Sequence, residues 1–329
     1  MSHTVAPAGQ SIPSPERRLH HLEKIVALLA LAAVLALAAG FAQAGAPKKK
    51  AKAAKPAAEQ AREPAEDALD RLQRENPDKV FVRSGAVLVQ DAQSGFTMLE
   101  KNGTAVLPIA SITKLMTAMV VLERGLDLAE RVAITEEDID TLKGTGSRLR
   151  PGAAMARQEL LLLALMASEN RAAHALGRTY PGGVAAFVDA MNARAQLLGM
   201  NDSRFADPTG LSPANVSSAR DLARLVQAAH GHATIREFST REAATVSVNG
   251  HELAYHNTNG LVRSGNWSIG LSKTGFINEA GRCLVMHARV AGRELVVVLL
   301  DSVGKQSRLG DANRIRKWLE ATAAGRPAS

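Results

Sequence analysis

The sequence predicts an α+β fold in which both chain ends contribute strands to one antiparallel sheet, with a helical lobe inserted between them. Strand patterns occur at 85–102 and return at 268–301, and apolar residues at helical spacing dominate the segment between. Because the strands do not alternate with helices, a parallel, doubly wound sheet is disfavoured.

The first element is expected to be a β-hairpin at 85–102, GAVLVQDAQSGFTMLEKN, which has an apolar strand, a turn at 93–95 and a returning strand. Apolar residues at helical spacing then run from Ile112 to Leu122. The same spacing predicts two further helices, RQELLLLALMA at 157–167 and GGVAAFVDAMNARAQLLG at 182–199.

The second half of the chain is predicted to begin with a helix and return to strands. Ser218 followed by Asp221 three residues later is a capping-box pattern, which marks a helix start. Three strands and a closing helix follow, with a tight turn at 291–292 between the last two strands. The expected segments are SIGLSKTGF at 268–276, RCLVMHARV at 282–290, RELVVVLLD at 293–301 and GDANRIRKWLEA at 310–321.

The amino terminus is expected to be an export signal. Basic residues precede an uncharged apolar run, Ile25–Phe41, and small residues follow it up to Ala44. Cleavage after Ala44 would place the rest of the chain in the periplasm, whereas a retained Ile25–Phe41 segment would anchor it in the membrane. The expected organisation is a signal peptide at 1–44, a Lys/Ala/Pro-rich linker at 45–79, a folded domain at 80–322 and a tail at 323–329.

Composition and net charge limit the classes of partner that the chain is expected to bind. The chain has 329 residues, 46% of them apolar, which is ample for a core, and its net charge is +8. Five lysines lie in the run Lys48–Lys55. Such a run is usually a solvated linker, and weak attraction to anionic lipid or wall polymer is the second expectation. A nucleic-acid partner is not expected, because the chain is exported and only 3% of its residues are aromatic.

One charged residue interrupts an otherwise uncharged stretch. Lys114 is the only charged residue between Lys101 and Glu123, and it follows Ser111 by three positions, so both side chains share a helical face. Burial would lower the pKa of this lysine, and a neutral amine beside a serine hydroxyl can act as its general base. The alternative is that Lys114 extends to solvent while Ser111 caps the helix.

Two further short motifs add to this pair. Ser168-Glu169-Asn170 breaks an apolar helix and by itself suggests a helix cap. Lys273-Thr274-Gly275 lies on a predicted strand, where an exposed edge lysine is ordinary. In the order S-x-x-K, S-x-N, K-T-G, however, the three motifs are the signature of penicillin-binding proteins and serine β-lactamases.

From about Val80 to Trp318 the chain resembles the low-molecular-mass penicillin-binding proteins, the serine D-alanyl-D-alanine peptidase family, and within them the D-alanyl-D-alanine endopeptidase branch. The likeness is carried by IASITKLMTAMVVLE, LLALMASENRAAHALGRTYPGG, DPTGLSPANVSSARDLARLV and LSKTGFINEAGRCLVMHARV. It implies a β-lactamase/transpeptidase-like fold, with 80–322 as the catalytic domain. It also implies hydrolysis of cross-links between peptidoglycan stem peptides, and acylation by β-lactam antibiotics.

The resemblance assigns three catalytic residues. Ser111 would be the nucleophile that forms the acyl-enzyme, and Lys114 would accept its proton. Ser168 would relay a proton to the leaving amine.

The resemblance also assigns the substrate-binding residues. Asn170 would hold the substrate amide, and Lys273 and Thr274 would contact its charge and hydroxyl groups. Gly275 would let an extended substrate lie close to the strand, because it has no side chain to intrude. The backbone N–H groups of Ser111 and Phe276 would form the oxyanion hole. Arg308 would bind the substrate carboxylate.

Two alternative functions remain open at this point. A β-lactamase of the same fold would need a deacylating glutamate after S-x-N, and Glu237, Glu242 and Glu252 lack the sequence context of one. A non-catalytic penicillin-binding sensor would not need all three motifs intact. No cofactor or metal is expected, since the histidines of HELAYH at 251–256 are five apart and miss the spacing of a zinc helix.

Overall fold

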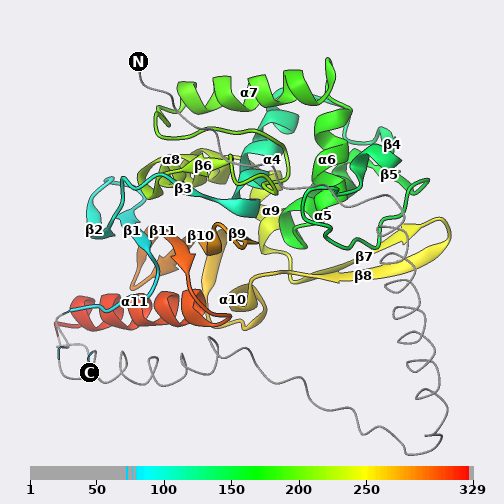
Figure 1. Ribbon diagram of the computed structural model, residues 1–329. Coiled ribbons are helices and arrows are strands. Elements are labelled where there is room, and N and C mark those ends of the chain that lie inside the picture. The colour runs from blue at the N-terminus through cyan, green and yellow to red at the C-terminus, as the bar shows by residue number, and fades with distance from the viewer. Residues whose placement is uncertain (1–71, 73–75, 77–78, 326–329) are drawn as a thin grey trace, which may run out of the picture. The chain divides into compact units, whose positions relative to one another are not determined.

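In the computed structural model, which describes residues 72, 76 and 79–325, five antiparallel strands form the central sheet (Figure 1). Their order is β2-β1-β11-β10-β9, so strands from the two ends of the chain lie side by side. This confirms the predicted antiparallel sheet with its inserted lobe. The strands are β1 (Ala86–Asp91), β2 (Thr97–Lys101), β9 (Ser268–Ile277), β10 (Gly281–Val290) and β11 (Arg293–Ser302).

The inserted lobe contains six helices of at least two turns among the described residues. The predicted helical segments all form, although Ser111 lies in a short 3₁₀ turn and the α-helix begins only at Lys114. The helices are α4 (Lys114–Glu123), α5 (Arg157–Met166), α6 (Asn170–Arg178), α7 (Gly183–Leu197), α8 (Ala219–His230) and α9 (Ala233–Thr240).

Shorter elements connect these parts. Three two-stranded ladders pair β3 (Leu107–Pro108) with β6 (Val216–Ser217), β4 (Arg131–Ala133) with β5 (Ala154–Ala156), and β7 (Ala243–Val248) with β8 (His251–His256). The single turns are η1 (Ala110–Thr113), η2 (Glu136–Asp138) and α10 (Gly260–Arg263).

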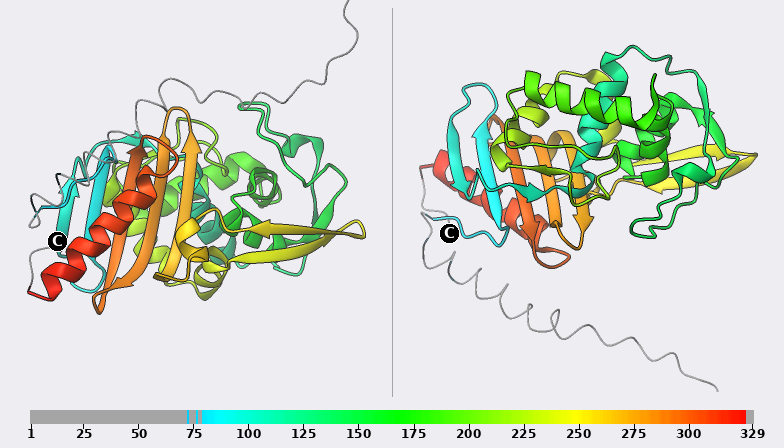
Figure 2. Two further views of the ribbon diagram at one scale, coloured as in Figure 1. Left: turned by 90° about the horizontal axis from the view of Figure 1, so that it is seen from below. Right: turned by 45° about the horizontal axis from the view of Figure 1, so that its top comes forward.

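Both faces of the sheet are covered, which explains why its central strands are continuously apolar. The closing helix α11 (Ser307–Ala323) crosses one face, and the helical lobe covers the other (Figure 2). Along β11, Val297 and Leu299 belong to the core cluster that contains Ile315 of α11. Their neighbours Val296 and Val298 belong to the core cluster of the lobe.

The predicted capping box is only half formed. Ser218 caps α8, because its side chain accepts a hydrogen bond from the Asp221 N–H at 3.2 Å. The Asp221 carboxylate does not return to Ser218. It accepts hydrogen bonds from the Asp202 N–H and the Ser203 hydroxyl, both at 2.8 Å, and so ties the preceding loop to the helix.

All described residues lie within the unit Pro56–Ser329. The expected signal peptide, nearly all of the linker and residues 326–329 of the tail lie outside the described residues. Within the described ranges, no helix is both long enough and apolar enough to cross a membrane.

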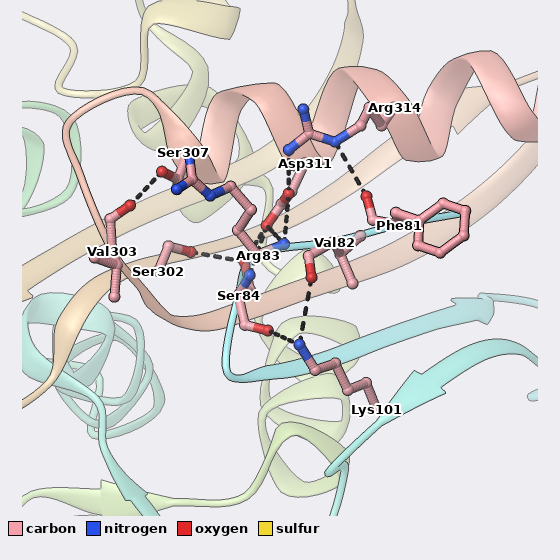
Figure 3. A network of polar contacts seen from close by, with 10 residues as sticks. All are labelled: Phe81, Val82, Arg83, Ser84, Lys101, Ser302, Val303, Ser307, Asp311 and Arg314. Carbon is pink, nitrogen blue, oxygen red and sulfur yellow. Dashed lines mark hydrogen bonds and ion pairs between the residues drawn. The ribbon is translucent and has the colours of Figure 1, made fainter. Parts of the chain in front are cut away.

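A buried polar network joins the start of the folded domain to α11 (Figure 3). The Asp311 carboxylate accepts hydrogen bonds from the backbone N–H groups of Arg83 and Ser84 and from the Ser84 hydroxyl, the last at 2.6 Å. It also pairs with Arg314 at 2.5 Å. The Ser84 hydroxyl in turn lies 2.7 Å from that of Ser302, at the end of β11. The fully buried Asp311 carboxylate therefore connects α11 to residues 83–84, and the Ser84 hydroxyl extends the network to β11.

We expect Asp311→Ala to destabilise the fold by about 3 kcal/mol, because it removes the carboxylate that pairs with buried Arg314 and leaves two backbone donors without their acceptor. Urea unfolding measures the change. Asp202→Ala, which removes an exposed carboxylate, serves as the matched control. Equal unfolding midpoints for the two variants would contradict this role of Asp311.

Candidate active site

The backbone that carries Ser111 is held between two glycines. Ala110 has a left-handed φ of 48°, which is unusual for a residue with a side chain. A Cβ added at Gly210 would lie 2.0 Å from the Ala110 carbonyl oxygen, and one added at Gly275 would lie 3.0 Å from the Ser111 nitrogen. Both close approaches require glycine. The structure thus adds a second reason for Gly275 beside the space expected for substrate.

Lys114 lies fully buried at the start of α4. Its ammonium nitrogen Nζ lies 2.9 Å from Ser111 Oγ, 2.7 Å from Asn170 Oδ1 and 2.6 Å from the carbonyl oxygen of Thr209. The side chain therefore does not extend to solvent, and that alternative is wrong. Burial lowers the pKa of Lys114 to about 7, although the nearby carboxylates of Asp207 and Glu169 oppose the shift.

The second motif forms the turn between α5 and α6. Glu169 caps α6, since its carboxylate accepts a hydrogen bond from the Arg171 N–H at 3.2 Å. Asn170 accepts from Lys114, and its amide nitrogen donates to Thr145 Oγ1 at 3.0 Å. Ser168 is half-buried with a left-handed φ of 60°, and its hydroxyl makes no hydrogen bond within the described part of the chain.

The third motif lies on β9, the edge strand beside η1. Lys273 is only 1% exposed and donates to the Thr274 carbonyl oxygen at 3.0 Å, so the alternative interpretation, an ordinary exposed edge lysine, is wrong. Burial, with Lys114 and Arg308 nearby, holds the pKa of Lys273 well below its usual value. The Thr274 hydroxyl lies 2.6 Å from that of Thr258.

Two candidate residues flank the end of β9. Phe276 is half exposed, and the guanidinium of Arg282 lies 4.5 Å from the centre of its ring. Arg308, at the start of α11, donates to the carbonyl oxygens of Gly275 at 3.2 Å and Cys283 at 3.3 Å. Burial lowers the pKa of Arg308 to about 10. This arginine therefore contacts the strand that carries the K-T-G motif.

The sequence interpretation missed the loop at 207–212, which supplies the Thr209 carbonyl to Lys114. Its D-P-T-G start is a recognisable turn signal. That signal predicts a turn, but it does not say which carbonyl faces a residue far away in sequence. Thr145 and Thr258, which bond to Asn170 and Thr274, were missed for the same reason.

A cavity of about 210 Å³ adjoins these residues, with Asn170 and Thr209 in its wall. Leu142, which also lines it, belongs to the loop before β5. The adjacent Lys143 forms an ion pair of 2.5 Å with Glu279, in the turn between β9 and β10. The cavity therefore adjoins two hydrogen-bond partners of Lys114, although Ser111 does not line it, and the loop that carries Leu142 is tied to the sheet. No cluster of His, Cys, Asp and Glu able to hold a metal ion occurs among the described residues.

Comparison with known proteins yields consistent matches. The chain is 47% identical over 239 residues to the D-alanyl-D-alanine endopeptidase of Pseudomonas aeruginosa, covering 72% of this chain and 77% of that protein. It is 45% identical over 241 residues to the D-alanyl-D-alanine endopeptidase of Escherichia coli K12, covering 73% and 78%.

A solved structure matches the fold as well. The crystal structure of the Streptomyces K15 DD-transpeptidase superposes with a TM-score of 0.69 at 28% identity, covering 74% of this chain and 99% of that one. The family model described as D-alanyl-D-alanine carboxypeptidase, Peptidase S11, matches residues 73–304, which include all three motifs. The chain therefore belongs to the Peptidase S11 family of D-alanyl-D-alanine carboxypeptidases, which are serine peptidases.

Proposed function

We propose that this peptidase is a D-alanyl-D-alanine endopeptidase that hydrolyses peptidoglycan cross-links through an acyl-enzyme on Ser111. The observation that carries the proposal is the 2.9 Å contact between Ser111 Oγ and the buried amine of Lys114. The names of its relatives, with 45% and 47% identity, favour endopeptidase activity over removal of a terminal D-alanine alone.

In the proposed acylation step, neutral Lys114 accepts the Ser111 proton while Oγ attacks the carbonyl carbon of the D-alanyl residue. Because burial brings the pKa of Lys114 to about 7, a large neutral fraction exists at physiological pH. The N–H groups of Ser111 and Phe276 stabilise the developing oxyanion. The close approach of Gly275 to the Ser111 nitrogen supports this, since it places β9 beside the nucleophile.

In the next step the C–N bond breaks, the amine of the second stem peptide leaves with the proton, and the acyl group stays on Ser111. Ser168 relays that proton, and water then hydrolyses the ester and restores the Ser111 hydroxyl. One feature supports this role for Ser168: Asn170, two residues on, bonds to Lys114, so the turn that carries Ser168 lies beside the base.

Substrate binding is assigned to Asn170, to the edge strand and to α11. An extended stem peptide lies along β9, where Gly275 presents no side chain and Thr274 offers a hydroxyl. Lys273 and Arg308 are buried cations whose pKa values lie below their usual range. An anionic carboxylate on the substrate would favour the charged form of Lys273, and Arg308, with a pKa of about 10, is charged at neutral pH; both facts support a role in binding the carboxylate.

A β-lactamase is the second candidate of the same fold, and the positions of the acidic residues disfavour it. Glu237, Glu242 and Glu252 are all exposed, on α9, before β7 and on β8. The buried Glu169 is already committed to capping α6. We therefore expect slow deacylation of a penicilloyl-enzyme. A non-catalytic sensor is disfavoured because all three motifs meet around one buried lysine.

Defined muropeptides test the function. The purified protein is incubated separately with cross-linked dimers and with monomeric pentapeptides, and the product masses are measured. We expect monomers to form from dimers, and Ser111→Ala to abolish this. Loss of D-alanine from pentapeptides with intact dimers would make the protein a carboxypeptidase, and no product from either substrate would refute a peptidase.

The proposed location is outside the cytoplasmic membrane, where peptidoglycan lies. Relatives named as D-alanyl-D-alanine endopeptidases support this coarser assignment, because D-alanyl-D-alanine bonds are those proposed here to be cut in peptidoglycan. We further propose cleavage after Ala44, and weak attraction of the run Lys48–Lys55 to anionic membrane or wall polymer. Amino-terminal sequencing of the mature chain tests the first. A membrane fraction that retains Ile25–Phe41 would instead show an anchored protein.

A further inference from the structure

The contacts of Lys114 favour one arrangement of its protons. A neutral amine has two N–H donors and one lone pair. Two of its three neighbours, Asn170 Oδ1 and the Thr209 carbonyl oxygen, can only accept hydrogen bonds. They therefore take both N–H groups and leave the lone pair facing the third neighbour, Ser111 Oγ, which can donate. The Thr209 carbonyl thus helps to aim the base at the nucleophile.

The Thr209 carbonyl is in turn set by a single carboxylate. Asp207 Oδ1 accepts hydrogen bonds from the Thr209 N–H and hydroxyl, both at 2.6 Å, and from the Gly210 N–H at 2.8 Å. Asp207 Oδ2 accepts from the Ser212 N–H at 3.0 Å and from the Asn215 amide at 2.5 Å. Five donors around one side chain define the shape of the loop 207–212.

The loop is also attached to α4 itself. The Thr117 hydroxyl donates to the Pro208 carbonyl oxygen at 2.7 Å. Thr117 lies close to one helical turn beyond Lys114, and Pro208 immediately precedes Thr209. Gly210, with its φ of 81°, then lets the loop approach Ala110. The same short loop therefore contacts the helix that carries the base and the backbone that carries the nucleophile.

We propose that Asp207 is a positioning residue for the general base: its carboxylate shapes the loop 207–212 so that the Thr209 carbonyl directs the Lys114 lone pair at Ser111 Oγ. This deepens the proposed function and rests on it. Asp207 makes no hydrogen bond to Ser111 or Lys114, and it acts through the Thr209 carbonyl.

Titratable groups face Lys114 from the elements packed against it, and they make the role of Asp207 measurable. Asp207 on the loop and Glu169 before α6 raise the pKa of Lys114, against the effect of burial, and Asp207 does so more strongly. Lys273 on β9 is the third neighbour, and its own pKa is lowered by burial and by Lys114. Removing the Asp207 charge therefore lowers the pKa of Lys114, and the low-pH decline in acylation rate moves to lower pH.

The test measures the second-order rate constant for acylation by a labelled penicillin between about pH 5 and pH 9.5, around the range in which Lys114 titrates. It compares wild type, Asp207→Asn and Asp207→Glu. We expect Asp207→Asn to lower the acylation rate constant at its high-pH plateau by about tenfold, because the loop loses its acceptor at Oδ2. We also expect the fall of this rate constant at low pH to move to lower pH. Asp207→Glu keeps the charge but moves the carboxylate, so the plateau falls while the decline stays in place.

The matched control is Asp202→Asn, which neutralises an exposed carboxylate before the same loop. It should leave both the plateau rate constant and the pH of its decline unchanged. A plateau within twofold of wild type in both Asp207 variants would overturn the proposal, as would a lower plateau with an unshifted decline in Asp207→Asn. Rate constants per labelled site do not depend on the folded fraction, and Asp207→Glu carries the test if Asp207→Asn does not fold. Failure of the proposed function is distinguishable, because wild type would then leave cross-linked muropeptide dimers intact, whereas failure of this proposal shows only in the acylation profiles of the Asp207 variants.

Discussion

A labelled penicillin is expected to form a stable adduct on Ser111 and on no other residue. The hydroxyl is in contact with a base, the surrounding backbone is held rigidly by two glycines, and none of the three candidate glutamates of the lobe is buried near the site. Acylation should therefore be efficient and deacylation slow, with turnover below about one per second. Peptide mapping by mass spectrometry locates the adduct, and its decay gives the deacylation rate.

Ser111→Ala should lose all labelling, whereas Ser268→Ala, which removes an exposed hydroxyl at the start of β9, should label like wild type. Label on a different residue would exclude Ser111 as the nucleophile. Rapid release of the penicilloyl group would favour the β-lactamase alternative instead.

Replacing Lys114 with arginine should lower the rate of acylation by at least about 10², the lower end of the range for losing general-base catalysis. Arginine keeps a positive charge but stays protonated throughout the usable pH range, so it cannot accept the Ser111 proton. In wild type the rate should rise with pH through about 7, where buried Lys114 loses its proton. The variant should lack this rise.

The measurement is the acylation rate constant against pH for both proteins, with circular dichroism to establish folding. Lys317→Arg, an exposed substitution on α11, is the matched control and should keep the wild-type profile. Acylation of Lys114→Arg within a few-fold of wild type would mean that the lysine is only structural.

The fold follows largely from local sequence patterns. The strands β10 and β11 could be predicted with the turn between them, because apolar residues run through both and Ala291–Gly292 adopts the left-handed turn that this short link requires. The start of α8 could be predicted from Ser218, since a cap acts on N–H groups within three residues. The second half of the predicted capping box, in which the Asp221 side chain would bond back to Ser218, was wrong. The Asp221 carboxylate instead bonds to Asp202 and Ser203 in the preceding loop.

The candidate site was predictable in its motifs but not in its surroundings. Ser111 and Lys114 could be paired from their spacing, and Asn170 could be added because the order of the three motifs is a family signature. The lowered pKa of Lys114 follows from its burial. The buried state of Lys273 could not be foreseen from an edge strand, because it depends on other elements packed around β9, including η1 and α9.

By itself the sequence determined the antiparallel architecture, the three motifs and the family resemblance, because each is written in residue types at short spacing. Only the tertiary structure decided what surrounds the nucleophile. The Thr209 carbonyl contacts Lys114, which is 95 positions away in the chain. Gly210 and Gly275, from two separate segments, pack closely against the backbone of residues 109–111. A backbone carbonyl has the same chemistry at every residue, so its direction carries no sequence signal. It is set by the packing of the loop 207–212, which the Asp207 carboxylate shapes.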